Sequence, residues 1–186
     1  MIARFLAWIR GLFTPSAPQL TGPVGAPPPA LPAGSSSPGA DGWAHPTGGL
    51  GRLTSKFGPR INPVTKQPQV HNGQDIAVPV GTPILAVKAG KVTVRKDDHP
   101  IAGRYIIVDH GDGFLSEYLH LSRGDVTVGQ TVKQGQIVGL SGGGLDKVTG
   151  KPLPGAGRST GPHLHFIVKR AGSAVDPASV IAALRA

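Results

Sequence analysis

The stretch RYIIVDHGDGFLSEYLHL, residues 104–121, holds two runs of β-branched and aromatic residues on either side of a turn. The turn is Asp112-Gly113, a dipeptide typical of two-residue hairpins because a type I′ turn requires positive φ at both positions. β-branched and aromatic residues favour strands. We therefore predict that this stretch forms an antiparallel β-hairpin.

Other segments repeat this pattern of short apolar runs bounded by Gly, Pro or Asp. They are QDIAVPV (74–80), PILAVKAGKVTVRK (83–96), QIVGLSG (136–142) and HLHFIVKR (163–170). With 28 Gly, 19 Pro and 5% aromatic residues, the chain of 186 residues also favours turns and strands over long helices. We predict one all-β domain over residues 43–186, an antiparallel sheet or sandwich. The similar stretches VGTPILAVKAGKV (80–92) and VGQTVKQGQIVG (128–139) indicate a duplicated β unit.

The end of the chain predicts a short closing helix. Asp176 is a favourable N-cap, Pro177 suits the first helical position, and ASVIAALRA, residues 178–186, has apolar residues at helical spacing.

The first 42 residues differ from this domain. MIARFLAWIRGLF, residues 1–13, places large apolar side chains on one helical face and Arg4 and Arg10 on the other. It is shorter than the roughly 20 residues that cross a bilayer, so we expect an amphipathic N-terminal helix on a membrane surface or on a partner protein. An unstructured start is the alternative, and a secretory signal is disfavoured because no A-x-A cleavage site follows. Residues 14–42 are rich in Pro, Ala, Gly and Ser and predict a disordered linker.

Composition also limits the chemistry. The absence of cysteine excludes disulfides, thiolate nucleophiles and Cys-based zinc sites, so a metal ion would be held by His, Asp or Glu. The formal net charge of +9 predicts attraction to a polyanion such as nucleic acid, an anionic membrane or an acidic cell wall. We expect no nucleic-acid partner, because no nucleic-acid-binding motif accompanies the charge.

The stretch GPHLHF, residues 161–166, contains two histidines one residue apart. In a strand, residues two apart project from the same face, so His163 and His165 share a surface while Leu164 and Phe166 point into the core. Taken alone, this pair is as compatible with two partly exposed histidines without a role as with a functional site.

VHNGQDIAV, residues 70–78, places His71 and Asp75 four apart, an even spacing that keeps both on one face of an extended segment. Two histidines and one carboxylate that leave a position open are typical of catalytic zinc sites. His120, in EYLHLS, is expected at a strand end on the same face as Tyr118. The other histidines are interpreted as loop or turn residues without a catalytic role, and they are His45, His99 and His110.

Three segments in this order resemble the lysostaphin-type, or LytM-like, zinc metallopeptidases, which cut peptide cross-links in bacterial peptidoglycan. They are LTSKFGPRINPVTKQPQVHNGQDIAVPVGTPILAVKAGKV (53–92), YLHLS (118–122) and GRSTGPHLHF (157–166). The resemblance runs from about Trp43 to Pro177. It implies a largely antiparallel β domain with a long groove, one zinc ion (Zn2+) per chain and a peptidoglycan peptide as substrate.

The resemblance also implies roles for single residues. By the H-x-x-x-D and H-x-H motifs, the zinc ligands would be His71, Asp75 and His165. His120 and His163 would be catalytic histidines that do not bind the metal. Because imidazole titrates near neutrality, we assign these two jointly to acid–base catalysis and transition-state stabilisation.

Residues 145–157 depart from the pattern of the family, because a longer loop precedes the H-x-H strand. Such a loop would lie near the groove and shape substrate choice or partly cover the site. A tolerated surface insertion is the alternative interpretation.

Other functions remain open from the sequence. The main alternative is a non-catalytic module that binds the cell wall or activates amidases, although all five expected site positions are filled. A carrier of the phosphotransfer or lipoyl type is disfavoured, because it would need one presented Lys or His rather than a ligand set. The expected location is the cell envelope, as a periplasmic, membrane-tethered or secreted enzyme, or the host cell wall for a phage-encoded one.

Overall fold

The structure is a computed structural model that describes residues 42–63 and 65–185. The helix predicted for residues 1–13 and nearly all of the linker predicted for residues 14–42 lie outside the described residues. In the part that is described, no helix is long and apolar enough to cross a membrane.

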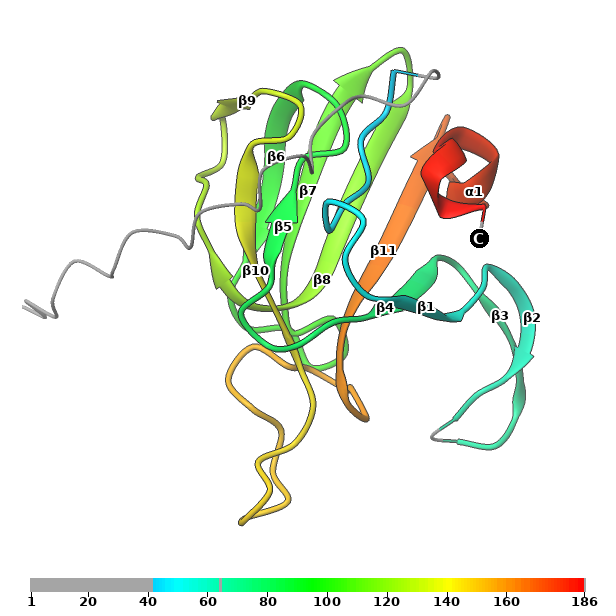
Figure 1. The fold of residues 1–186 in the computed structure, drawn as a ribbon, viewed down its shortest axis with the longest axis vertical. Helices are drawn as coiled ribbons and strands as arrows, with labels where there is room; N and C mark the ends of the chain where they lie inside the picture. The colour runs from blue at the N-terminus through cyan, green and yellow to red at the C-terminus, as the bar shows by residue number, and fades with distance from the viewer. Residues whose placement is uncertain (1–41, 64, 186) are drawn as a thin grey trace, which may run out of the picture.

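The fold is built almost entirely from antiparallel strands, as predicted (Figure 1). Ten strands form one sheet: β1 (Arg52–Ser55), β4 (Gln74–Ala77), β5 (Pro83–Leu85), β6 (Gly90–Lys96), β7 (Arg104–Gly111), β8 (Phe114–Gly124), β9 (Thr131–Val132), β10 (Ile137–Gly143), β11 (Pro162–Arg170) and β12 (Ser173–Val175). The order is β1-β4-β11-β10-β8-β7-β6-β9, with β12 beside β11, β5 beside β10, and a further pairing of β8 with β11. Two more strands, β2 (Gly58–Ile61) and β3 (Pro68–His71), form a separate ribbon that projects beside β4 (Figure 1).

The stretch 104–121 forms the predicted hairpin from β7 and β8. Asp112 and Gly113 have φ values of 51° and 76°, so both central residues of the turn are in the left-handed region that a type I′ turn requires.

The two similar stretches at 80–92 and 128–139 begin with the same kind of turn. Gly81 and Gly129 both have a φ of 89°. The residue after each glycine donates its N–H to the carbonyl three residues back, at 3.2 and 3.1 Å. A strand follows each turn, β5 in the first stretch and β9 in the second. The similarity therefore corresponds to a repeated turn-and-strand unit.

The closing helix begins where predicted and is shorter than predicted. The Asp176 side chain accepts the N–H of Ala178 at 3.0 Å, and α1 spans Pro177–Val180. Ile181 then adopts an extended backbone and is fully buried, which ends the helix after one turn. A 3₁₀ turn, Ala182–Leu184, follows. Burial of one apolar side chain thus outweighs the helical pattern of the sequence.

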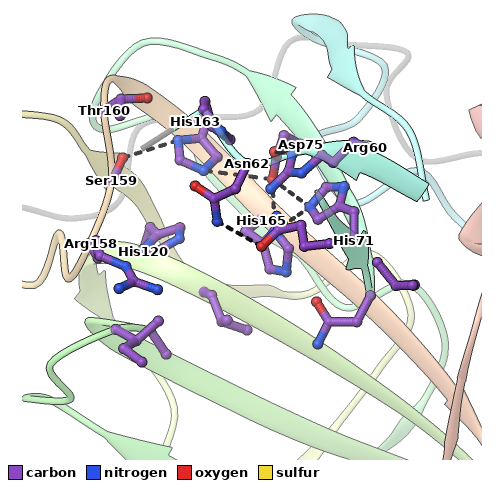
Figure 2. Close-up of a pocket in the computed structure, with 17 residues that line it drawn as sticks. Arg60, Asn62, His71, Asp75, His120, Arg158, Ser159, Thr160, His163 and His165 are labelled. Carbon is purple, nitrogen blue, oxygen red and sulfur yellow. Dashed lines mark hydrogen bonds and ion pairs between the residues drawn. The ribbon is translucent and has the colours of Figure 1, made fainter. Parts of the chain in front are cut away.

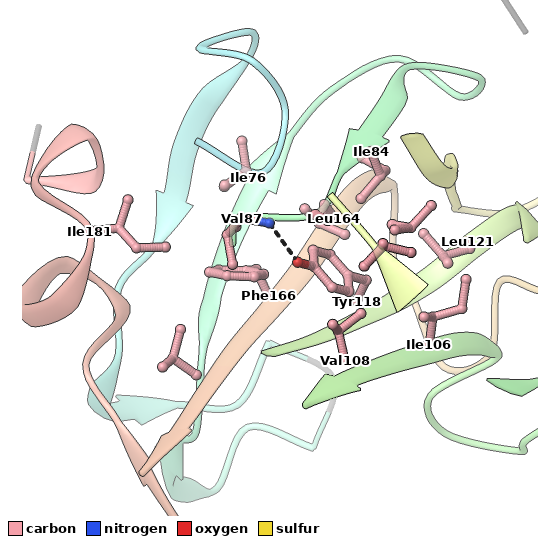
Figure 3. Packing of buried hydrophobic residues seen from close by; sticks show 14 of the residues in the cluster. Ile76, Ile84, Val87, Ile106, Val108, Tyr118, Leu121, Leu164, Phe166 and Ile181 are labelled. Atoms are coloured by element: carbon pink, nitrogen blue, oxygen red, sulfur yellow. Dashed lines mark hydrogen bonds between the residues drawn. The ribbon is translucent and has the colours of Figure 1, made fainter. Parts of the chain in front are cut away.

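The core lies on one face of the sheet, where side chains of β7, β8 and β11 meet Val87, in the segment after β5, and Ile181, near the end of the chain (Figure 3). Tyr118 heads its largest fully buried side chains, which include Phe166, Ile76, Ile84, Leu121, Leu164 and Ile181. The Tyr118 hydroxyl accepts the N–H of Val87 at 3.0 Å and is 2.9 Å from the Ser116 hydroxyl. Burial raises the pKa of Tyr118 to about 12, so the phenol stays protonated. This hydroxyl thus makes two hydrogen bonds inside an apolar core.

His110 also takes part in the packing around this core. Its Nδ1 is 3.0 Å from the Ala89 carbonyl oxygen, and its Nε2 is 2.7 Å from the Ser116 hydroxyl. Its ring packs edge-on against Trp43, with 5.3 Å between the centroids. His110 is therefore a packing group within β7 and not the loop or turn residue that the sequence indicated.

We predict that Tyr118→Phe lowers the free energy of unfolding by about 1–3 kcal/mol, because the buried N–H of Val87 loses its acceptor. Urea denaturation measures this. Tyr105→Phe is the matched control, since no hydrogen bond to the half-buried Tyr105 hydroxyl occurs within the described ranges. Equal effects of the two substitutions would contradict the role given to the buried hydroxyl.

Candidate metal centre and active site

The register between β4 and β11 brings the two halves of the predicted ligand set together. Asp75 lies directly opposite His165, and Ile76 lies opposite Leu164. Because side chains alternate along a strand, the first pair stands on one face while Ile76 and Leu164, 2% and 0% exposed, enter the core on the other. The prediction that Leu164 points into the core while His165 lies on the opposite face of the strand is thus confirmed.

His71 reaches the same place through a tight turn between β3 and β4. Gly73 lies in this turn, where a Cβ atom would be 2.4 Å from the carbonyl oxygen of Phe166 on β11. Only glycine allows this close approach of the two backbones. The glycine in the H-x-G-x-D spacing is therefore a structural requirement of the site.

The side chains of His71, Asp75 and His165 converge on one point (Figure 2). His165 Nδ1 is 2.7 Å from Asp75 Oδ1. His71 Nε2 is 3.1 Å from His165 Nδ1 and 3.3 Å from Asp75 Oδ1. Two ligand atoms about 2.0–2.1 Å from one tetrahedral zinc ion lie roughly 3.3 Å apart, so these separations suit a shared metal ion.

The protonation of His71 also fits a metal ligand. Its Nδ1 is 2.8 Å from the carbonyl oxygen of Lys56, which only accepts, so Nδ1 carries the proton. In the neutral ring Nε2 then has a lone pair, which faces Asp75 Oδ1 at 3.3 Å. Two lone pairs at this distance repel one another, so the approach requires positive charge between them, either a metal ion or a second proton on the ring. The hydrogen bond from the second ring nitrogen is the usual support of a metal-binding histidine.

Arg60, which no sequence motif pointed to, holds the second oxygen of Asp75. Arg60 Nη1 is 2.8 Å from Asp75 Oδ2 and 2.5 Å from the Ser55 hydroxyl. Burial by itself raises the pKa of Asp75, but hydrogen bonds and charge interactions with His165 and His71 outweigh it and hold the pKa below its usual range. The carboxylate is therefore ionised, with Oδ1 directed at the two histidines.

His163 and His120 lie beside this cluster and present equivalent nitrogen atoms. Their Nδ1 atoms are 2.8 Å from the Gly161 carbonyl oxygen and 2.7 Å from the Ala156 carbonyl oxygen, respectively. Each Nδ1 thus carries a proton, and each Nε2 is free to accept one. The two ring centroids are 4.8 Å apart, and His163 Nε2 is 3.7 Å from Asp75 Oδ1. Burial, followed by repulsion from the other site histidines, lowers the pKa of His120 to about 4.

The orientation predicted for His120 is wrong. Simple alternation puts it on the face of Tyr118, yet Tyr118 is in the core while His120 lines the site. The pairs Ile106↔Tyr118 and Arg104↔Leu121 show that β8 carries one extra residue relative to β7. His120 adopts a φ of 62° within this bulge. β-bulges re-aim side chains near active sites, and this one turns the imidazole toward the other site histidines.

The inserted residues 145–157 do not line the site. Most of them form a loop that projects beyond the ends of β10 and β11 (Figure 1), and Val148 in it is 93% exposed. None of them lines either of the two cavities at the site. Only the end of the loop approaches, at Ala156, whose carbonyl oxygen holds His120. The structure therefore supports the surface-loop interpretation over a cover.

Two cavities meet at the candidate metal centre. The smaller has a volume of about 250 Å³, and its walls include His71, His120, Arg158 and His165. The larger has a volume of about 450 Å³, and its walls include Ser55, Ile61, Ala77 and Pro162. Asp75 and His163 line both, so the cavities form one groove with the centre at their junction. Neither is lined by His45, His99 or His110.

Comparison with known proteins places these features in a wider group. The sequence profile of Peptidase family M23 matches residues 69–177. The chain is 42% identical over 123 residues to the peptidoglycan DD-endopeptidase ShyA of Vibrio cholerae. That match covers 66% of this chain and 26% of ShyA, so the chain spans about a quarter of the length of this relative.

Solved structures give the same picture. A zinc containing peptidase from Vibrio cholerae aligns with a TM-score of 0.59 and 39% identity, covering 73% of this chain and 36% of that chain. The catalytic domain of the antimicrobial peptidase lysostaphin from Staphylococcus simulans aligns with a TM-score of 0.57 and 31% identity, covering 69% of this chain and 90% of that chain.

The positive φ of His120 predicts an order of stability among substitutions at this position. We expect His120→Val to unfold about 1–3 kcal/mol more easily than His120→Asn, because Asn tolerates the left-handed region and a β-branched residue does not. Urea denaturation of the two variants measures the difference. The same pair of substitutions at Lys91, an exposed position of β6 that pairs in regular register with Asp109 and Thr131, should show no penalty for Val. A His120→Val variant as stable as His120→Asn would contradict the bulged backbone.

Proposed function

The chain belongs to peptidase family M23, and we propose that it is a zinc-dependent endopeptidase that hydrolyses peptide cross-links of bacterial peptidoglycan. Membership confirms the resemblance to lysostaphin-type metallopeptidases, and the antiparallel fold agrees with it. Three relatives are named peptidoglycan DD-endopeptidases, which supports the substrate. The chain spans about a quarter of their length, so the activity is proposed for this chain on the strength of its own site.

The convergence of three donor atoms carries the proposal. His71 Nε2, Asp75 Oδ1 and His165 Nδ1 would hold one zinc ion, and the lone pair on His71 and the ionised carboxylate fit such an ion. The similarity to a zinc containing peptidase supports zinc over other metals. When bound at such a site, zinc supplies a water molecule of lowered pKa and polarises a carbonyl oxygen.

His120 and His163 would move protons. Each is held by a main-chain carbonyl at Nδ1 and presents Nε2 to the groove, so each can take a proton there and later donate it. One such transfer activates the attacking water, and another provides the proton that the leaving amine requires. Glu117 does not compete for this role, because its carboxylate pairs with Lys169 at 2.7 Å.

The accessible groove favours catalysis over the alternative of a non-catalytic wall-binding or amidase-activating module. The inserted loop lines neither cavity, and all five side chains expected for catalysis lie at the junction or in the smaller cavity. Relatives named peptidoglycan endopeptidases support a location in the cell envelope.

We predict that the purified, zinc-loaded chain cleaves peptidoglycan of defined cross-link chemistry, and that a zinc chelator abolishes the cleavage. Mass spectrometry of the new amino termini identifies the bond. Absence of cleavage by protein that demonstrably holds zinc would move the function to a non-catalytic module.

Variants separate metal binding from proton transfer in the same assay. His71→Ala or Asp75→Ala should lose both zinc and activity, because each removes a proposed ligand. His120→Ala or His163→Ala should keep zinc, measured by elemental analysis, and lose turnover by about 10²–10⁴-fold. An active variant at any of these positions would contradict the assigned roles.

We propose further that residues 1–13, which lie outside the described residues, bind a membrane surface through the apolar face of an amphipathic helix. Deletion of residues 1–13 should then move the protein from the membrane pellet to the supernatant when it is sedimented with anionic lipid vesicles. Substitution of Arg4 and Arg10 by Gln, which keeps the apolar face, is the matched control and should weaken binding only in part. Unchanged sedimentation after the deletion would rule this role out.

A further inference from the structure

Among the described residues that line the groove, one cationic side chain has no hydrogen-bond or ion-pair partner. Arg158 lines the smaller cavity together with His120 and His163. Figure 2 shows it on the side of the pocket where His120 lies, across from Arg60. Arg158 is exposed, and its guanidinium makes no hydrogen bond or ion pair within residues 42–63 and 65–185. Arg60, in contrast, is engaged by Asp75 Oδ2 at 2.8 Å.

The backbone around Arg158 is fixed. Its N–H donates to the Ile101 carbonyl oxygen at 2.9 Å. The preceding Gly157 packs so closely that a Cβ atom there would lie 2.3 Å from the nitrogen of Gly103. The following residue, Ser159, is buried. The guanidinium therefore extends from an ordered base, which lowers the entropic cost of binding a ligand.

Charge is distributed unevenly along the groove. Arg60 and Asp75 line both cavities and pair with each other. Apart from histidine, the larger cavity has no other ionisable side chain among its lining residues, whereas the smaller one has Arg158. The smaller cavity therefore favours an anionic group. A guanidinium matches a carboxylate in particular, because its parallel N–H groups bind both oxygens.

We propose that Arg158 binds a carboxylate of the substrate next to the scissile bond, and that it thereby selects cross-links bearing a free carboxylate over neutral ones such as oligoglycine. This inference rests on the proposed function and specifies its substrate class. The carboxylate belongs either to the C-terminus of the cross-linked peptide or to a diacid residue within it. Both sources offer the same two oxygens, so substrates that differ in one group at a time distinguish them.

The test uses synthetic cross-link peptides of one sequence with both carboxylates free, with the terminal or the diacid carboxylate converted to a carboxamide, or with both converted. The ratio kcat/KM is measured for zinc-loaded wild type and Arg158→Gln. Wild type should cleave the free peptide roughly 10-fold or more faster than the peptide that lacks the recognised carboxylate. Arg158→Gln should lose this preference. On the doubly amidated peptide, its kcat/KM should equal the value that wild type has on that same peptide. The single amidation that slows cleavage by wild type shows which carboxylate, the terminal one or that of the diacid residue, Arg158 binds.

Arg170→Gln is the matched control for loss of one positive charge. Arg170 ends β11 at the end opposite to His163, and its guanidinium lies over the Phe114 ring, 5.3 Å from the centroid. This variant should keep the full preference for the free carboxylate. Zinc content and Tm of Arg158→Gln should match those of wild type, because the side chain is exposed. A loss in Arg158→Gln of equal size on free and amidated peptides would overturn the inference.

Binding separates failure of this inference from failure of the proposed function. If the zinc-loaded wild type cleaves none of the peptides, the proposed function fails. Isothermal titration with the same peptides then decides the role of Arg158. Tighter binding of the free-carboxylate peptide that Arg158→Gln abolishes would support it, and equal binding of free and amidated peptides would overturn it.

Discussion

The antiparallel register of β4 against β11 is the constraint on which the rest of the site depends. It sets Asp75 opposite His165 on the groove face and Ile76 opposite Leu164 in the core. A slip of one residue would exchange the two faces, burying a carboxylate among apolar side chains and exposing an isoleucine. Both changes are unfavourable. The packing of the core and the geometry of the proposed ligand set are therefore enforced by the same strand pair.

An irregular stretch of β8 then brings His120 into the site that the regular strand pairing forms. Regular strands bring the carboxylate and one imidazole together, but they leave His120 on the wrong face. One extra residue in β8 and a left-handed φ at His120 correct this, and the Ala156 carbonyl oxygen holds the ring in its new direction. The strain of that backbone is retained because Tyr118, two residues before His120, and Leu121, directly after it, are both fully buried.

Features that depend on near neighbours in the chain could be predicted from the sequence. The Asp112-Gly113 turn, the shared face of His163 and His165, and the Asp176 N-cap all follow from local rules, and the resemblance to a known family indicated the three side chains that converge, His71, Asp75 and His165. Features that depend on distant contacts could not. Arg60 meets Asp75 only because the β2–β3 ribbon folds back toward β4, and no spacing in the sequence signals that contact. The closing helix ends early because Ile181 enters a core that local helical spacing does not describe.

Three of the site histidines are oriented by main-chain carbonyl groups, those of Lys56, Ala156 and Gly161. Every amino acid offers the same carbonyl, so the tautomers of the site are encoded in the path of the backbone and not in the identity of the residues along it. The loops that carry these acceptors can then drift in sequence, and even accept insertions, while the chemistry is inherited unchanged. Such an arrangement separates the evolution of what the groove recognises from the evolution of the proposed reaction.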